Sequence, residues 1–240
     1  MLRQKLYSAG LLIYCSLITV GNLQKAPGNK TKIVTSSNTI YNDTIISQAP
    51  ALPSARLDLN QAALHFAKEY VKENIWDLEK LKKGIQSKFS TINSVFSKYN
   101  VPSELKYLAI VESNLDMDTA CSSAGARGIW QLMPVTASEL GLKITDSVDE
   151  RLLFHKSSAA AAKYLKQLYA EFGDWLLVVA AYNSGPAKVT RAIDLSGSHT
   201  FWQMQNFLPA ETRYHVKRFV SMLYFFEGQN RAKDLLMGHL

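Results

Sequence analysis

Apolar residues recur every three or four positions along most of the chain, and this spacing constrains the fold more than any other feature. In the segment 57–98 apolar residues recur at Leu64, Ala67, Val71, Ile75, Leu78, Leu81, Ile85, Phe89, Ile92 and Phe96. Such spacing lines one face of a helix, so the segment predicts one long amphipathic helix or a broken pair, with Gly84 as the candidate break. The alternation typical of β-strands is hard to find, and we therefore expect an all-α fold.

Four further helices are expected beyond residue 100. The first begins at Ser103, whose hydroxyl group can cap the opening turn, and runs to Glu112. The segments 157–172 and 211–226 are amphipathic, whereas 175–182 is apolar throughout. An apolar helix of this kind is buried on all sides, so we place 175–182 in the centre of the domain.

Length and composition indicate one globular domain with appendages. The chain has 240 residues, of which 47% are hydrophobic, and a formal net charge of +7. The charge favours anionic partners, but zinc-finger spacing, aromatic RNA-binding motifs and dense Lys/Arg blocks are absent from the sequence. We therefore expect no nucleic acid, and an anionic polymer such as a bacterial cell wall fits the charge. The five histidines are scattered without ligand spacing, so no metal or other cofactor is expected.

The first residues have the organisation of an export signal. A basic start, an apolar stretch over 6–20 and a polar exit predict a signal peptide or an uncleaved membrane anchor over 1–25. Residues 26–56, rich in Ser, Thr, Asn and Pro, read as a flexible linker. We expect a helical extension at 57–100, a catalytic domain at 101–230, and a monomer exported to the periplasm or cell envelope.

Glu112 is the leading catalytic candidate in the sequence. It ends the apolar run that begins at Tyr107, and helical spacing puts it on the same core-facing stripe as Leu105 and Leu108. Burial beside apolar side chains disfavours the ionised form of a carboxyl group, so a glutamate placed there can hold a proton and act as an acid.

Three later segments can supply a binding cleft. In the glycine-bounded turn 125–134, Met133 offers apolar surface and Gln131 offers an amide, while Trp130 either faces the cleft or is buried in the core. The segment 180–186 ends a buried helix at Tyr182 and Asn183, where side chains can leave the core; the alternative is simple helix termination. In the third segment Glu211 and Tyr214 can point the same way, or Tyr214 can lie in the core.

Together these motifs resemble, in order, those of the soluble-type lytic transglycosylase (SLT) domain family, nearest to its membrane-bound murein transglycosylases of the D type. The matching segments are Glu112-Ser113, 128–134, 181–185 and 211–214, within a resemblance that covers roughly 102–226. It implies a goose-lysozyme-like helical fold that binds the glycan strands of peptidoglycan. By this resemblance Glu112 is catalytic, and the substrate-binding residues are Ser122 or Ser123, Gln131, Met133, Tyr182, Asn183, Glu211 and Tyr214. The stretch between Glu112 and Gly128 is one residue longer than in the family, which leaves the choice between the two serines open.

The resemblance also implies a one-carboxyl reaction. Glycosidases ordinarily use two carboxyl groups, and no second carboxylate stands in a convincing motif. Glu112 would protonate the bond between N-acetylmuramic acid and N-acetylglucosamine, and then take the proton of the C6 hydroxyl as it closes on C1, giving a 1,6-anhydro product. The alternatives are a lysozyme-like hydrolase, which uses water, and a non-catalytic protein that binds the cell wall.

Overall fold

The computed structural model describes the backbone of residues 61–116 and 121–237, with side chains described up to residue 229. The regular elements in these ranges are helices, accompanied by two isolated antiparallel bridges, Arg127 with Leu132 and Ile144 with Asp149. The predicted all-α architecture is therefore confirmed for the described residues. The signal or anchor and the linker predicted for 1–56 lie outside them. No helix in the described part of the chain is long and apolar enough to span a bilayer.

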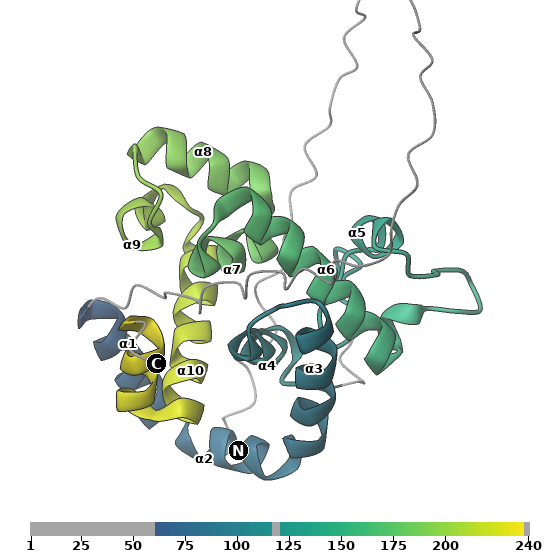
Figure 1. Ribbon diagram of the computed structural model, residues 1–240, viewed down its shortest axis with the longest axis horizontal. Coiled ribbons are helices and arrows are strands. Elements are labelled where there is room, and N and C mark those ends of the chain that lie inside the picture. The colour runs from purple at the N-terminus through teal and green to yellow at the C-terminus, as the bar shows by residue number, and fades with distance from the viewer. Residues whose placement is uncertain (1–60, 117–120, 238–240) are drawn as a thin grey trace, which may run out of the picture.

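The segment predicted as one long helix or a broken pair forms three helices. They are α1 (Gln61–Glu73), α2 (Ile75–Gly84) and α3 (Gln86–Lys98), as Figure 1 shows. The chain breaks near Gly84 as predicted, and it breaks a second time at Asn74. The Asn74 amide group donates a hydrogen bond of 2.8 Å to the carbonyl of Tyr70, and such local side-chain bonds compete with helix continuation.

The helix predicted from Ser103 begins with a short 3₁₀ turn. This turn, η1 (Ser103–Lys106), leads into α4 (Tyr107–Ser113), which ends where Asn114 adopts a left-handed backbone with φ of 55°. The predicted cap at Ser103 is wrong, because its hydroxyl group donates instead to the Glu104 carboxylate at 3.4 Å. Every residue of α4 except Glu112 is buried, so this short helix is a central element of the fold.

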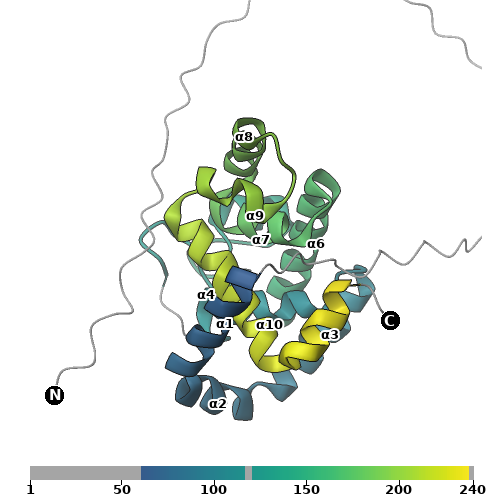
Figure 2. The ribbon, with the colours of Figure 1, turned by 90° about the vertical axis from the view of Figure 1, so that its left-hand side faces the viewer.

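The helices over 154–172, 175–184 and 210–237 agree with the three remaining predicted segments, with extended ends, whereas the other elements beyond α4 were not predicted. The elements beyond α4 are α5 (Pro134–Glu139), η2 (Glu150–Leu152), α6 (Phe154–Phe172), α7 (Trp175–Ser184), α8 (Pro186–Ser196), α9 (Phe201–Met204), η3 (Gln205–Phe207) and α10 (Ala210–Met237). Helix α10 bends sharply at Gly228, whose φ of 74° lies in the left-handed region. Figure 2 shows the part of α10 beyond this bend running in a different direction from the part before it.

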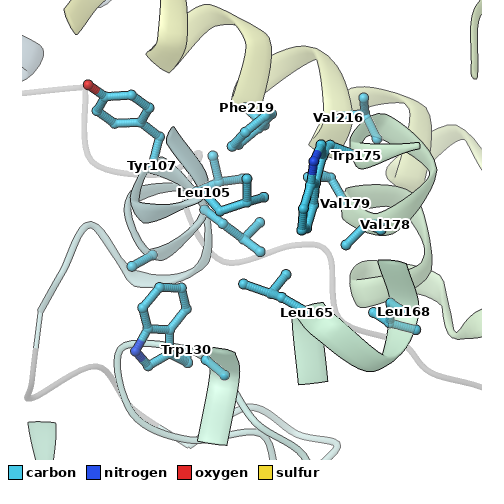
Figure 3. Packing of buried hydrophobic residues seen from close by; sticks show 14 of the residues in the cluster. Leu105, Tyr107, Trp130, Leu165, Leu168, Trp175, Val178, Val179, Val216 and Phe219 are labelled. Atoms are coloured by element: carbon cyan, nitrogen blue, oxygen red, sulfur yellow. The ribbon is translucent and has the colours of Figure 1, made fainter. Parts of the chain in front are cut away.

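Helix α7 lies in the core, as its uniform apolarity predicts. Every residue from Trp175 to Ala181 is buried, and the Asp174 carboxylate caps the helix by accepting the Leu177 N–H at 2.9 Å. Figure 3 shows Val179 of α7, Leu105 of η1 and Phe219 of α10 meeting in one cluster. Helix α10 packs against α1, α4 and α7, so the C-terminal ends of α4 and α7 converge with the start of α10.

Candidate active site

Glu112 lines a pocket to which four segments of the chain contribute. These are the end of α4, the turn 125–133, the junction of α7 with α8, and the start of α10. The lining residues are Glu112, Ala126, Gln131, Met133, Tyr182, Asn183, Ser184, Lys188, Pro209, Glu211 and Thr212. Each of the four motifs recognised in the sequence therefore contributes a wall.

A second pocket adjoins the first. It shares six residues with the first and extends to Thr136 of α5, Tyr164 of α6 and Gly185. The shared residues are Gln131, Met133, Tyr182, Asn183, Ser184 and Lys188. The two pockets share walls and together make one groove that reaches from Glu112 to Tyr164.

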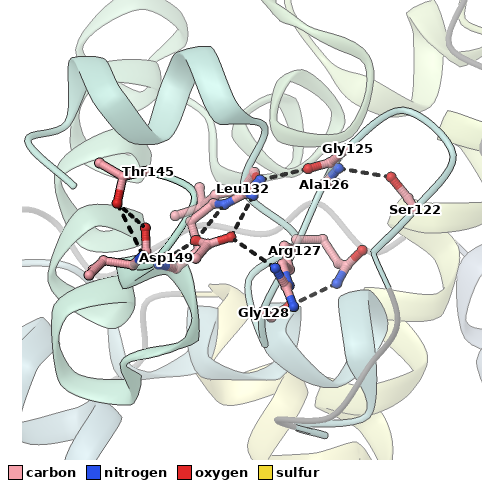
Figure 4. Close-up of polar contacts among 11 residues, drawn as sticks. Ser122, Gly125, Ala126, Arg127, Gly128, Leu132, Thr145 and Asp149 are labelled. Atoms are coloured by element: carbon pink, nitrogen blue, oxygen red, sulfur yellow. Dashed lines mark hydrogen bonds and ion pairs between the residues drawn. The ribbon is translucent and has the colours of Figure 1, made fainter. Parts of the chain in front are cut away.

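The turn 125–133 is held by a buried arginine that follows it in the chain. Arg151 Nη1 donates to the carbonyl oxygens of Gly125 at 2.6 Å and Leu132 at 3.0 Å, across both ends of the turn. Its Nε and Nη2 donate to the two carboxylate oxygens of Asp149 at 2.9 and 2.7 Å, as Figure 4 shows in part. Hydrogen bonding from Arg151 holds the pKa of Asp149 below its ordinary value, so this carboxyl group is ionised at neutral pH.

Gly128 lets the turn approach this arginine. Its φ is +77°, and a Cβ atom added there would lie 2.2 Å from the carbonyl oxygen of Arg151. Gln131 also has a positive φ, of 45°, and its side-chain amide donates back to the Gly128 carbonyl at 2.8 Å. The side-chain amide of Gln131 therefore uses one of its N–H groups to stabilise the turn itself.

Trp130 anchors the turn in the core and contributes no surface to the groove. Its side chain is 0% exposed, and its indole N–H donates to Ser158 Oγ at 3.0 Å. The sequence left open whether Trp130 faces the cleft or is buried in the core, and the structure shows that it is buried. Ser113, which follows Glu112, donates to the carbonyl of Ile129 at 2.9 Å and so ties α4 to the same turn.

Tyr182 connects α7 to the turn. Its hydroxyl group donates to the Trp130 carbonyl at 2.7 Å, and its ring lies 5.4 Å from that of Tyr164. Burial, and then the negative charge of Glu112, raise the pKa of Tyr182 well above its ordinary value. The phenol therefore stays protonated, and it acts as a donor that holds one wall of the pocket.

His215 is the site residue that sequence reasoning missed. Its Nε2 atom lies 2.9 Å from Glu112 Oε1, and the two side chains are only 7% and 11% exposed. The histidine had no motif context. One feature of the sequence could have pointed to it, because His215 lies on the same face of α10 as the buried residues Val216 and Phe219. A buried histidine needs a hydrogen-bond partner, so its position on this face indicates a polar contact.

The structure brings together six of the nine predicted site residues. Glu112, Gln131, Met133, Tyr182, Asn183 and Glu211 line the pocket, whereas Ser122, Ser123 and Tyr214 are not among the residues that line either part of the groove.

The other three predicted residues have different surroundings. Ser122 Oγ accepts the backbone N–H of Ala126 at 2.9 Å, so its hydroxyl group closes a turn, and Ser123 is exposed. Tyr214 is half exposed and packs edge-on against Phe66 of α1, with ring centroids 5.9 Å apart. This contact places the Tyr214 ring beside α1, and its predicted role in binding substrate stays a prediction.

A metal site is not formed by the described side chains. In the ranges 62–116 and 121–229, no three His, Cys, Asp or Glu residues are grouped so that they could hold an ion.

Comparison with known proteins identifies the domain. The family model described as the transglycosylase SLT domain matches residues 90–205. The chain is 41% identical over 139 residues to membrane-bound lytic murein transglycosylase D of Escherichia coli K12, a match that covers 56% of this chain and 30% of the relative. It is also 39% identical over 87 residues to peptidoglycan transglycosylase gp16 of Escherichia phage T7, covering 35% of this chain and 6% of that protein. The chain thus spans less than a third of the length of these relatives.

Two solved structures share the fold. An inactive mutant of the lytic transglycosylase Slt from Pseudomonas aeruginosa superposes with a TM-score of 0.53 at 20% identity, over 74% of this chain and 32% of that one. The 70 kDa soluble lytic transglycosylase SLT70 from Escherichia coli gives a TM-score of 0.51 at 22% identity, over 71% and 31%. These matches confirm the predicted fold class. Residues 90–205 of the chain thus match the transglycosylase SLT domain family.

Proposed function

We propose that this protein is a peptidoglycan lytic transglycosylase that cleaves the bond between N-acetylmuramic acid and N-acetylglucosamine without consuming water. The observation that carries the proposal is Glu112, a carboxyl group only 11% exposed, at the wall of a groove formed by all four family motifs. A shielded carboxyl group beside an extended groove suits proton transfer to a polymer held in place.

Glu112 acts twice in the proposed reaction. It first gives its proton to the glycosidic oxygen, and the bond from that oxygen to C1 of the muramoyl sugar breaks. The substrate N-acetyl group stabilises the positive charge left at C1. The Glu112 carboxylate then takes the proton of the C6 hydroxyl group, whose oxygen closes on C1 to give the 1,6-anhydro sugar. The proton returns to Glu112, so the enzyme is ready for another turnover.

The other groove residues hold the sugar chain in this proposal. Asn183 and Gln131 offer amide groups for hydroxyl and N-acetyl groups, and Met133 offers an apolar surface for a sugar ring. Lys188, an exposed cation that lines both parts of the groove, suits the carboxylates that muramic acid and its peptides carry. Peptidoglycan is thus the partner, and the protein acts as an exported monomer of the cell envelope.

The test is digestion of purified peptidoglycan by the wild-type protein and by Glu112→Gln, with the products weighed by mass spectrometry. Glutamine keeps the shape of the side chain but cannot carry the proton, so we expect turnover to fall about a thousand-fold with the fold intact. Asp116→Asn, which changes an exposed carboxylate beyond α4, is the matched control and keeps wild-type activity. Retained cleavage by Glu112→Gln contradicts the proposal.

A lysozyme-like hydrolase is the second candidate, because Glu211 brings another carboxyl group to the same pocket. In that reaction one carboxyl group acts as the acid and the other as nucleophile or base. The Glu211→Gln variant separates the two. It abolishes the reaction of a two-carboxyl hydrolase, but in the one-carboxyl reaction it weakens sugar binding and leaves anhydro products.

A further inference from the structure

His215 is a buried histidine that the proposed reaction does not use, and it lies against the proposed catalytic group. Its Nε2 atom is 2.9 Å from Glu112 Oε1. Its other ring nitrogen, Nδ1, is buried and has no hydrogen-bond partner among the residues that the structure describes. The two nitrogens therefore have unequal surroundings, and this difference decides where the ring proton resides.

The unpartnered Nδ1 disfavours two of the three forms of the ring. Both the imidazolium ion and the neutral Nδ1–H tautomer put an N–H group at Nδ1, where it would be a buried donor without an acceptor, which is unfavourable. The Nε2–H tautomer leaves only an acceptor unsatisfied, and it directs its single N–H at Glu112 Oε1.

We infer that His215 is a positioning residue: as the neutral Nε2–H tautomer, it donates a fixed hydrogen bond to Glu112 Oε1. This inference rests on the proposed function of Glu112. With Oε1 held by His215, Oε2 carries the proton that passes to and from the sugar. The Oε1 contact persists in both protonation states, because a carboxylic acid with its proton on Oε2 accepts at Oε1 just as a carboxylate does.

The alternative, an ion pair between a protonated His215 and an ionised Glu112, opposes the first step of the reaction. A cation beside Oε1 stabilises the carboxylate, which has no proton to give. A neutral N–H donor also orients the carboxyl group, but it stabilises the ionised form of Glu112 much less than a cation does. The position of His215 within α10 supports this role: Val216 and Phe219 fix the helix in the core, while Thr212 lies one turn earlier in the pocket wall.

The first test reads the tautomer directly, by long-range proton–nitrogen NMR of the histidine rings in the full-length protein at the pH of the activity assay. We expect His215 to be neutral with its proton on Nε2, both in the wild type and in Glu112→Gln, whose amide oxygen still accepts. His155, which is exposed, serves as the internal reference. An imidazolium ion or an Nδ1–H tautomer at His215 overturns the inference, whether or not the protein cleaves peptidoglycan.

The second test separates positioning from folding. His215→Leu removes the donor, and we expect kcat to fall about 10- to 100-fold, the effect of one lost hydrogen bond to a charged group, with KM within about two-fold. His215→Gln, whose amide N–H reaches the same position, should recover most of that loss, and His155→Leu is the control for an exposed histidine. Wild-type kcat in His215→Leu, or equal losses in the Leu and Gln variants, contradicts the inference. If the wild type itself cleaves nothing, the proposed function fails, and the NMR result alone decides the state of His215.

Discussion

The Tyr182 hydroxyl group donates a 2.7 Å hydrogen bond to the backbone carbonyl of Trp130. This bond joins the end of the buried helix α7 to the middle of the turn 125–133, although the two residues are 52 positions apart. The turn that lines the groove is therefore tied to a helix of the core, and the side chain that ties it also lines the pocket beside Glu112.

Tyr182→Phe removes this bond and leaves the ring in place. We expect the free energy of unfolding to fall by about 1 kcal/mol, because the Trp130 carbonyl loses its partner. Turnover should fall about ten-fold, because the turn is less well positioned. Urea denaturation and a peptidoglycan digestion assay measure the two effects. Tyr99→Phe is the control, since Tyr99 packs on the core outside both parts of the groove; equal behaviour of the two variants would contradict the role of Tyr182.

Gly128→Ala tests the close approach of the turn to Arg151. The added Cβ would lie 2.2 Å from a carbonyl oxygen, so the turn must move, in addition to the strain of a side chain at φ +77°. Gly173→Ala is a matched control: its φ is +65°, but nothing lies within 4 Å of the added atom, and it should cost only about 1–2 kcal/mol. We expect Gly128→Ala to be clearly less stable than this control by thermal denaturation and to lose cleavage activity. Equal stability of the two variants would show that the approach is not tight.

Arg151→Met breaks the buried ion pair that holds the turn. It leaves Asp149 without its main partner and strips two carbonyl oxygens of a donor, so we expect a loss of about 3–5 kcal/mol in the free energy of unfolding. Lys72→Met, which breaks an exposed pair with Glu69, should cost less than about 1 kcal/mol. Losses of the same size would rule out Arg151 as the anchor of the turn.

The same pair makes stability depend on pH in the acid range. Because Arg151 lowers the pKa of Asp149 in the folded protein below its ordinary value of 3.8, the stabilisation is complete above that value. It is lost as the pH falls through the lower, folded pKa. The difference in stability between wild type and Arg151→Met should therefore be largest above pH 3.8 and shrink on further acidification. Urea denaturation at a series of pH values measures it, and a difference that stays constant down to the acid limit would contradict the assignment.

Much of the fold follows from local sequence patterns. The uniform apolarity of 175–182 predicts its burial, and the stripe on 211–226 predicts a long packed helix; both are observed. The break at Asn74 could not be predicted from periodicity, because the apolar spacing continues across it and the interruption comes from a side-chain amide bonding to the backbone.

Local sequence patterns likewise predict some residues of the candidate site and not others. Glu112 and the residues beside glycines or helix ends could be predicted, because their surroundings are encoded nearby in the chain. The surroundings of Tyr214 and His215 depend on long-range packing: Phe66 of α1 contacts the first, and α4 brings Glu112 to the second across 103 positions. Neighbouring positions on one helix thus have different roles, and local spacing cannot assign them.

The central claim is that Glu112 closes the C6 oxygen of the substrate onto C1 and that water does not take part. Digestion of peptidoglycan in water enriched in the heavy oxygen isotope tests this most directly, because the origin of the oxygen at C1 distinguishes the two reactions. We expect 1,6-anhydro products that carry no heavy oxygen and weigh one water less than reducing sugars. Reducing ends that contain heavy oxygen would contradict it and would identify the protein as a hydrolase.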